Sequence, residues 1–345
     1  MTTRQKKILF VHDDNPADPL SSFINQDLLF LRQWYQVEVL SLYPYKHAHL
    51  GAFISPKVWK AVASCDAVFS WFGWNAPAVI MAGMLGKPSV VIAGGADVTA
   101  VPEIGYGIGR EGIKSRLTAS LLYSGYRHAK RVLLFSEASR KDFIKLPGVD
   151  SEKGETLYLG IDTGHFTPAG VKQQQVLTVS YISESALRRK GLLTFVAAAN
   201  TLPDVKFRIG GLVNQQSALD KLLSQAPPNV EFLGYLNDRQ LLEEYRQASA
   251  YVQLSHHEGF GLAIAEAMAC EAVPVVTERG SIPEVVGDTG LYVPLDDPAA
   301  AGEAIRRALE SVGALGRDAR ERIVTRFPLA AREERIRAIM EELIP

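Results

Sequence analysis

Short apolar runs alternate with segments of helical length along the whole chain. Strands that alternate with helices in this way form parallel sheets, because a parallel connection needs a crossover segment to return to the same edge. We therefore predict an α/β fold whose sheets carry helices on both faces. The strands are expected at residues 8–12, 37–42, 67–71, 89–93 and 132–136 in the first half, and at residues 176–182, 206–210, 230–233, 250–254 and 273–276 in the second half.

The length of the chain indicates two domains. At 345 residues it is too long for one small core and fits two domains of ordinary size. A polar stretch with few structure-forming residues, 169–175, separates the two series of strands and is typical of a linker. We expect a Rossmann-like domain over residues 1–168, a second over residues 169–328, and a last helix over residues 329–345.

Composition and charge disfavour several classes of protein. Apolar residues make up 47% of the chain and charged residues 22%, as in globular proteins, and the formal net charge of -1 gives no attraction to nucleic acid. The two cysteines, Cys65 and Cys270, lie far apart and indicate a reducing compartment. The first residues are not those of a signal peptide, and no apolar run approaches the roughly 20 residues of a membrane-spanning helix. We expect a cytoplasmic protein.

A strand, a glycine loop and a helix form the most distinctive stretch of the chain. The apolar run 250–254 leads to Gly259 and Gly261, and small residues with helical spacing follow. Glycines let backbone N–H groups approach a ligand closely, and the beginning of a helix attracts negative charge. The stretch therefore predicts an anion site, most naturally for a diphosphate.

Two carboxylates flank this loop. Glu258 lies on the loop, and Glu266 lies about one and a half turns into the helix. A carboxylate in such a place can accept two hydrogen bonds from a vicinal diol such as a ribose. The alternative is that Glu258 is a solvated loop residue and that Glu266 lies on the helix surface.

The surroundings of the two carboxylates resemble those of a known family. They form a Glu-x7-Glu pattern with Gly-Phe-Gly between them, and Glu-Ala-Met-Ala begins at Glu266. Residues 272–277 and 280–290 are similar to the strand and loop that follow in that family. The stretch resembles the donor-site signature of retaining glycosyltransferases of the GT-B fold, family 4. The resemblance implies two Rossmann-like domains that face a cleft, with a C-terminal helix that crosses back to the first domain.

The resemblance also implies roles for basic residues of the second domain. Lys190 and the glycine after it match the family's Lys-Gly pair, so that Lys190 is expected to bind the diphosphate. The family's upstream Gly-Arg is replaced by Ser-Glu at 183–184, and Arg188 or Arg189 has to supply the arginine. The catalytic candidates are therefore Lys190, Arg189 and Glu258.

The remaining donor-site residues follow from the same resemblance. Glu266 is expected to hold the ribose, and Glu258 the hydroxyls of the donor sugar. Residues 229–236 resemble the strand and loop that hold the nucleobase through backbone groups. The further donor-binding candidates are Arg188, Gly234, Tyr235, Leu236, Gly259, Phe260, Gly261 and Leu262.

Polar residues after two strands of the first domain are candidates for the acceptor wall, because ligands bind beyond the carboxyl ends of parallel strands. Asp13 and Asp14 follow the first strand, and Gly95 and Asp97 follow the fourth. Many family members carry a histidine near the second point, and Asp97 is the substitute candidate here. The alternative is that these residues form turns and caps.

Three further patterns bear on partners. Basic residues alternate with leucine and tyrosine over 110–131, as in a helix that lies on an anionic membrane surface, although a solvated face packed on its own domain is the alternative. The GxGxxG pattern at 107–112 follows a loop rather than a strand, so it does not predict a dinucleotide site. The chain has no HExxH motif and no Asp-x-Asp pair, and we expect no metal.

We therefore expect a metal-independent, retaining glycosyltransferase (EC 2.4 class). It would move a hexose or N-acetylhexosamine from a nucleotide diphosphate-sugar, its co-substrate, to a glycan or lipid-linked acceptor, with no further cofactor. The expected place is the cytoplasm, with peripheral contact to the inner face of a membrane as a further option. The alternatives are a nucleotide-sugar epimerase or a phosphorylase on the same fold, a nicotinamide dehydrogenase, and a non-catalytic nucleotide- or sugar-binding protein.

Overall fold

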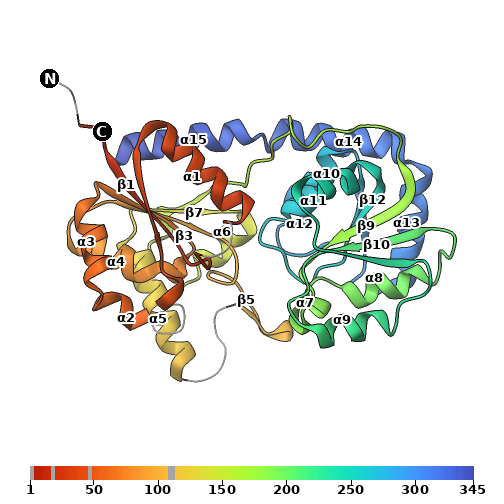
Figure 1. The fold of residues 1–345 in the computed structure, drawn as a ribbon, viewed down its shortest axis with the longest axis horizontal. Coiled ribbons are helices and arrows are strands. Elements are labelled where there is room, and N and C mark those ends of the chain that lie inside the picture. The colour runs from red at the N-terminus through yellow and green to blue at the C-terminus, as the bar shows by residue number, and fades with distance from the viewer. Residues whose placement is uncertain (1–3, 17–19, 46–48, 108–112) are drawn as a thin grey trace. The chain divides into compact units, whose positions relative to one another are not determined.

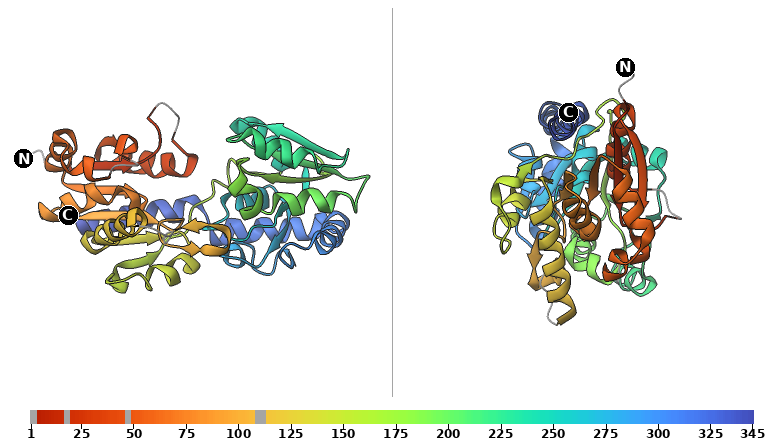
Figure 2. Two further views of the ribbon diagram at one scale, coloured as in Figure 1. Left: turned by 90° about the horizontal axis from the view of Figure 1, so that it is seen from below. Right: turned by 90° about the vertical axis from the view of Figure 1, so that its left-hand side faces the viewer.

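The computed structural model describes residues 4–16, 20–45, 49–107 and 113–345. Its contacts divide the chain into two compact units, Met1–Leu159 with Ala330–Pro345, and Gly160–Leu329. Each unit contains a six-stranded parallel sheet, and helices lie on both faces of each sheet (Figures 1 and 2). The alternation of strands and helices in the sequence predicts this arrangement.

The sheet of the first unit has the strand order β2-β1-β3-β4-β7-β8. Its central strands are apolar and buried on both faces, as in other parallel sheets covered by helices. The strands are β1 (Lys7–His12), β2 (Gln36–Ser41), β3 (Ala67–Trp71), β4 (Ser89–Ala93), β7 (Arg131–Leu134) and β8 (Gly154–Thr156), and β5 (Ala100–Val101) pairs with β6 (Tyr106–Gly107) separately. The helices are α1 (Ser22–Trp34), α2 (His49–Phe53), α3 (Pro56–Ser64), α4 (Ala76–Met84), α5 (Ile113–His128), α6 (Glu137–Phe143) and α15 (Leu329–Leu343).

The sheet of the second unit has the order β11-β10-β9-β12-β13-β14. Its strands are β9 (Gln173–Val179), β10 (Lys206–Gly210), β11 (Val230–Gly234), β12 (Ala248–Gln253), β13 (Val273–Thr277) and β14 (Leu291–Val293). The helices are α7 (Glu184–Arg189), α8 (Leu192–Ala199), α9 (Gln216–Leu223), α10 (Asp238–Gln247), α11 (Leu262–Ala269), α12 (Ile282–Val286), α13 (Pro298–Glu310) and α14 (Val312–Arg326). The edge strands β8 and β14 were not predicted, because three residues are too few to show a period.

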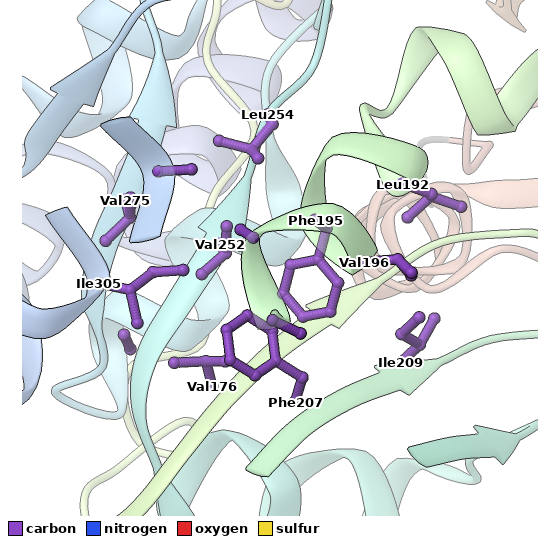
Figure 3. Close-up of a cluster of buried hydrophobic side chains, with 14 of the residues drawn as sticks. Val176, Leu192, Phe195, Val196, Phe207, Ile209, Val252, Leu254, Val275 and Ile305 are labelled. Atoms are coloured by element: carbon purple, nitrogen blue, oxygen red, sulfur yellow. The ribbon is translucent and has the colours of Figure 1, made fainter. Parts of the chain in front are cut away.

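A cluster of buried side chains holds α8 against the sheet of the second unit (Figure 3). The rings of Phe195 on α8 and Phe207 on β10 lie 5.1 Å apart between centroids, in an edge-to-face arrangement. Val176 and Val252 extend this cluster along β9 and β12. The packing fixes the position of α8, and with it the turn that joins α8 to α7.

The last helix, α15, packs on the first unit, as the resemblance implies. Arg332 is 3% exposed, and its guanidinium donates to both carboxylate oxygens of Asp27 on α1, over 2.9 and 2.7 Å. It also donates to the backbone oxygens of Leu157 and Tyr158. Figure 1 shows α15 running alongside α1. A buried ion pair and two carbonyls thus join the C-terminal helix to the first sheet unit.

The contacts of residues 160–168 lie with the second unit, whereas the sequence division at 168 placed this segment in the first domain. Arg320 of α14 donates to the backbone oxygen of Phe166 over 3.0 Å, and Arg246 of α10 donates to that of Thr167 over 2.8 Å. These hydrogen bonds come from helices far along the chain, so the sequence gives no local sign of them.

Candidate functional site

Two glycines with positive φ shape the loop between β12 and α11 and the loop that packs against it. Gly261 has φ 94° and caps α11, and Gly280 has φ 55° in the neighbouring loop. A Cβ at Gly280 would lie 2.3 Å from the backbone oxygen of Glu258, so only glycine fits there. The Ser281 N–H donates to that same oxygen over 3.1 Å. The loop that contains Gly280 and Ser281 therefore holds the backbone oxygen of Glu258.

Lys190 and Glu258 form a buried ion pair in the second unit. Lys190 Nζ donates to Glu258 Oε1 over 2.6 Å, and the side chains are 18% and 8% exposed. Lys190 follows the last residue of α7 as its C-cap, and the next residue, Gly191, has φ 66°. A Cβ at Gly191 would lie 2.1 Å from the backbone oxygen of Leu254. The close approach of this turn to the end of β12 brings the lysine to the glutamate.

The surroundings of the Lys190–Glu258 pair favour the ionised form of Glu258. Burial opposes the charge of Glu258, but Lys190 and Arg189, with hydrogen bonds from Lys190 and Ser255, outweigh it and hold the pKa of Glu258 below its usual range. Burial lowers the pKa of Lys190, and Glu258 opposes this shift. An anion bound beside Lys190 would replace the solvation that burial removes.

Glu266 lies on α11 in a different electrostatic setting. Burial raises its pKa to about 7, and a hydrogen bond from Tyr245 Oη to Glu266 Oε2, over 3.0 Å, opposes the shift. Among the described residues, none donates to Oε1 of Glu266. The carboxylate therefore has one oxygen anchored and one that can accept hydrogen bonds from a ligand such as a diol.

The two candidate arginines lie in different surroundings. The charge of Arg189 acts on both Lys190 and Glu258, which places it near the ion pair. Arg188 is exposed and lines a cavity of about 220 Å³ together with Glu184, Lys221 and Asp296. The charge interactions thus favour Arg189 over Arg188 as the arginine that acts on Glu258.

The other donor-site candidates are spread along two loops. The ring of Phe260 is buried against Phe327, 5.6 Å away between centroids, so that a ligand could contact only its backbone. Gly259 and Leu262 are half-buried on either side of it. In the loop after β11, Gly234 has φ 72°, Tyr235 is 69% exposed and Leu236 is half-buried.

In the first unit, the side chain of Asp97 binds backbone N–H groups of two loops. Its carboxylate accepts hydrogen bonds from the N–H groups of Gly73, Gly94 and Gly95 and from Tyr126 Oη, over 2.9 to 3.3 Å. The residue is fully buried, and burial raises its pKa against these bonds. The side chain therefore fixes the loops after β3 and β4, which differs from the acceptor contact expected from the sequence.

The carboxyl end of β1 is more open. Asp13 and Asp14 are half-buried, and the backbone oxygen of Asp14 accepts a hydrogen bond from Ser41 Oγ. His12 is buried beside them, and burial lowers its pKa while Asp14 opposes the shift. At the end of the adjacent strand β3, Phe72 has φ 68° and ψ 144°, a conformation that non-glycine residues rarely adopt. No sequence pattern indicates that strained residue.

Sequence reasoning also missed the partners of the glutamates. Tyr245 binds Glu266, and Gln253 and Ser255 bind Glu258. The sequence contains one signal for the partners of Glu258: Gln253 and Ser255 are polar residues at and just after the end of the apolar strand β12. Buried polar side chains need hydrogen-bond partners, so these two could have been expected to bind a nearby polar group.

The basic stretch 110–131 is described in part, since residues 108–112, and with them the last five positions of the GxGxxG pattern, lie outside the described residues. In α5, Leu122 and Tyr126 are buried while Arg116 and Leu117 are exposed. Among the residues that the structure describes, no helix is both long and apolar enough to cross a membrane. The same described residues contain no cluster of three His, Cys, Asp or Glu side chains that could hold a metal ion.

The match to a family model lies within the second unit. Residues 173–311 match the family model described as glycosyl transferases group 1, a range that contains both glutamates and Lys190. The O-antigen chain mannosyltransferase B of Escherichia coli is 26% identical over 205 residues, which are 55% of this chain and 54% of that protein. The alpha-maltose-1-phosphate synthase of Mycobacterium tuberculosis is 30% identical over 216 residues, with 55% and 54% covered. The chain thus spans about half the length of these curated relatives.

A solved structure extends the likeness to both units. HepE from Anabaena, in complex with UDP and glucose, matches with a TM-score of 0.78 at 18% identity, and the match covers 98% of this chain and 100% of that one. The fold is therefore GT-B, as predicted. The family match over residues 173–311 confirms the resemblance to glycosyltransferases that the Glu-x7-Glu stretch indicates.

Proposed function

We propose that this chain, whose residues 173–311 belong to the glycosyl transferases group 1, is a retaining glycosyltransferase. It transfers a hexose or N-acetylhexosamine from a nucleotide diphosphate-sugar to a glycan or lipid-linked acceptor. The observation that carries the proposal is the buried ion pair of Lys190 and Glu258, which are 68 positions apart in sequence. It lies in the family-matched unit, next to the glycine loop that begins α11.

Each charged residue of the candidate site has a role in the proposed reaction. Departure of the diphosphate leaves negative charge on its oxygens, and Lys190 and Arg189 stabilise it together with the amides that begin α11. Glu258 accepts hydrogen bonds from hydroxyls of the donor sugar. Glu266 accepts hydrogen bonds from the ribose through the oxygen that no described residue occupies.

The first experiment identifies the nucleotide. Thermal unfolding is measured with UDP, GDP, ADP, dTDP and NAD, each at about 1 mM. A ligand at a hundred times its dissociation constant adds roughly 2.7 kcal/mol to the free energy of unfolding, a shift of several degrees. UDP-sugars and mannosyl donors come first in the transfer assays, because HepE is solved with UDP and glucose and one relative is a mannosyltransferase.

Variants then test the assigned residues. Lys190→Ala is expected to lower kcat about a hundredfold, because one donor to the leaving group is lost. Glu266→Ala is expected mainly to weaken nucleotide binding. Lys206→Ala removes an exposed lysine from β10 and serves as the charge control. Unchanged kinetics in the first two variants would refute the site.

Retention, metal independence and the catalytic step itself have separate tests. The anomeric configuration of the product, followed by proton NMR from the start of the reaction, should be that of the donor, and activity should persist in EDTA. Nucleotide-sugar conversion without an acceptor would indicate an epimerase, and a phosphate requirement a phosphorylase. Tight nucleotide binding without turnover of any donor would indicate a binding protein.

For a lipid-linked acceptor, the proposal includes contact of residues 110–131 with the cytoplasmic face of an anionic membrane. Exposed Arg116 and Leu117 on α5 support this part of the proposal. Co-sedimentation with anionic vesicles at low salt tests it, with neutral vesicles as the control. Equal recovery in both pellets would contradict the electrostatic contact.

A further inference from the structure

A chain of buried polar groups leads from the sheet of the second unit to Glu258. The N–H of Val179 on β9 donates to Tyr251 Oη over 3.3 Å, and Tyr251 Oη donates to Gln253 Oε1 over 3.1 Å. Gln253 Nε2 in turn donates to Ser255 Oγ over 2.8 Å and to Glu258 Oε1 over 2.6 Å. Tyr251, Gln253 and Ser255 are between 0% and 3% exposed. The chain of bonds is therefore shielded from water.

The chemistry of the groups fixes the direction of these bonds. An ionised carboxylate can only accept, so the Gln253 amide must turn its NH2 group toward Glu258 and its oxygen toward Tyr251. Both amide hydrogens are then used, one by Ser255 and one by Glu258. Ser255 Oγ accepts from Gln253 and donates its own proton to Glu258 Oε1 over 2.7 Å. One arrangement satisfies every group.

Three donors meet on a single oxygen of Glu258. Lys190, Gln253 and Ser255 all donate to Oε1, and none of the described residues donates to Oε2. Two of the three donors are neutral and belong to β12 and the residues directly after it. The carboxylate is thus anchored at one oxygen and open at the other.

We propose that Gln253 is a positioning residue for sugar transfer, which holds Glu258 by its Oε1. Oε2 of Glu258 is then available to the donor sugar, and the Lys190 ammonium is available to the diphosphate. This inference rests on the proposed function. When Lys190 shares its charge with a bound diphosphate, its attraction for Glu258 weakens. A buried carboxylate that loses its partners takes up a proton or reorients. The two neutral donors remain and keep the carboxylate ionised and in place.

Within the described part of the chain, charge interactions with Glu258 are found for three titratable groups from two elements. Lys190 and Arg189 lie at the end of α7, and Tyr251 lies on β12. All three are retained in the variants proposed here. A change in the titration of Glu258 then reports the loss of the Gln253 donor.

The informative variant is Gln253→Leu, which removes the amide and keeps a similar volume. Gln175→Leu is the matched control, because Gln175 is a fully buried glutamine on the neighbouring strand β9 whose amide has no partner among the described residues. Gln253→Glu is the second variant: its carboxyl group can donate to Glu258 only when it is protonated. Circular dichroism and thermal unfolding establish that each variant is folded.

The first readout needs no substrate. Carbon NMR of protein labelled at the glutamate side-chain carboxyl follows the titration of Glu258, whose signal is identified by its loss in Glu258→Gln. We expect the midpoint to move to higher pH in Gln253→Leu and to stay unchanged in Gln175→Leu, because a hydrogen bond to the charged form favours ionisation. A merely structural role of Gln253 would not move it.

The second readout is the pH profile of transfer, with the nucleotide sugars of whichever nucleotide stabilises the protein. Loss of one hydrogen bond to a charged group is expected to lower kcat about tenfold to a hundredfold at neutral pH, with little change in KM for the donor. The acid limb of the profile should move to higher pH in Gln253→Leu. In Gln253→Glu, activity should recover as the pH falls and the new carboxyl group takes up a proton.

The outcomes separate the two proposals. An unchanged Glu258 midpoint in Gln253→Leu, in an enzyme that transfers sugar, overturns the inference alone. A shifted midpoint in a protein that transfers sugar from no donor overturns the proposed function and the catalytic purpose of the network. A shifted midpoint with an unshifted kcat profile overturns the positioning role.

Discussion

Replacing Arg332 by leucine should destabilise the first unit severely. The arginine and Asp27 are almost completely buried and share two hydrogen bonds, and the arginine also satisfies two backbone carbonyls. The variant leaves a buried carboxylate without its counter-charge, which costs about 3 to 5 kcal/mol. For a unit of this size each kcal/mol lowers Tm by about 2 to 4 °C, so a decrease of roughly 6 to 20 °C is expected.

The neighbouring Arg335 provides the control on the same helix. It pairs with Glu155 at the surface, with side chains 45% and 29% exposed, and Arg335→Leu should cost only about 0 to 1 kcal/mol. The double variant Asp27→Leu/Arg332→Leu should recover much of the loss, because it removes both buried charges. Calorimetry and urea unfolding followed by tryptophan fluorescence measure all three.

The destabilisation should also depend on pH with a definite sign. Burial already raises the pKa of Asp27, and Arg332 opposes that shift. Without the arginine the folded variant binds a proton that the unfolded chain releases, so its stability falls as pH rises above the ordinary aspartate range. The cost of Arg332→Leu should therefore be smaller at about pH 5 than at about pH 8. A cost equal to that of Arg335→Leu, or one independent of pH, would refute this account of the buried pair.

Two further predictions concern the second unit. Burial raises the pKa of Glu266 to about 7, and ribose hydroxyls donate hydrogen bonds to its ionised form, so nucleotide affinity measured by calorimetry should rise as pH increases through 7. Glu266→Gln should remove this pH dependence of the affinity. A parallel rise in the variant would contradict the ribose contact. Gly191→Ala should lower the free energy of unfolding in urea by more than about 2 kcal/mol, because its Cβ would lie 2.1 Å from the Leu254 backbone oxygen. Gly170→Ala has a similar φ and no atom within 4 Å of its Cβ, and should lower it by about 1 kcal/mol. Equal losses would show that the structure relieves the contact with Leu254.

Much of the candidate site could be located from the sequence because its signals are local. Gly259 and Gly261, between Glu258 and Glu266, lie on a strand–loop–helix unit, and each of these elements leaves its own pattern in the sequence. The pairing of Lys190 with Glu258 was not visible in that pattern, although both residues were candidates. The distance of 2.6 Å between Lys190 Nζ and Glu258 Oε1 results from the close approach of two turns that are far apart in the chain.

The sequence by itself determined the alternation of strands and helices, and with it the two parallel sheets, because apolar periodicity reflects burial within a single element. Only the tertiary structure decided which arginine lies near Glu258, that Asp97 is enclosed by backbone amides, and that Gln253 reaches the carboxylate. These outcomes depend on side chains from different elements that share one buried volume. Burial and partner choice are properties of the packed fold, so no window of sequence contains them.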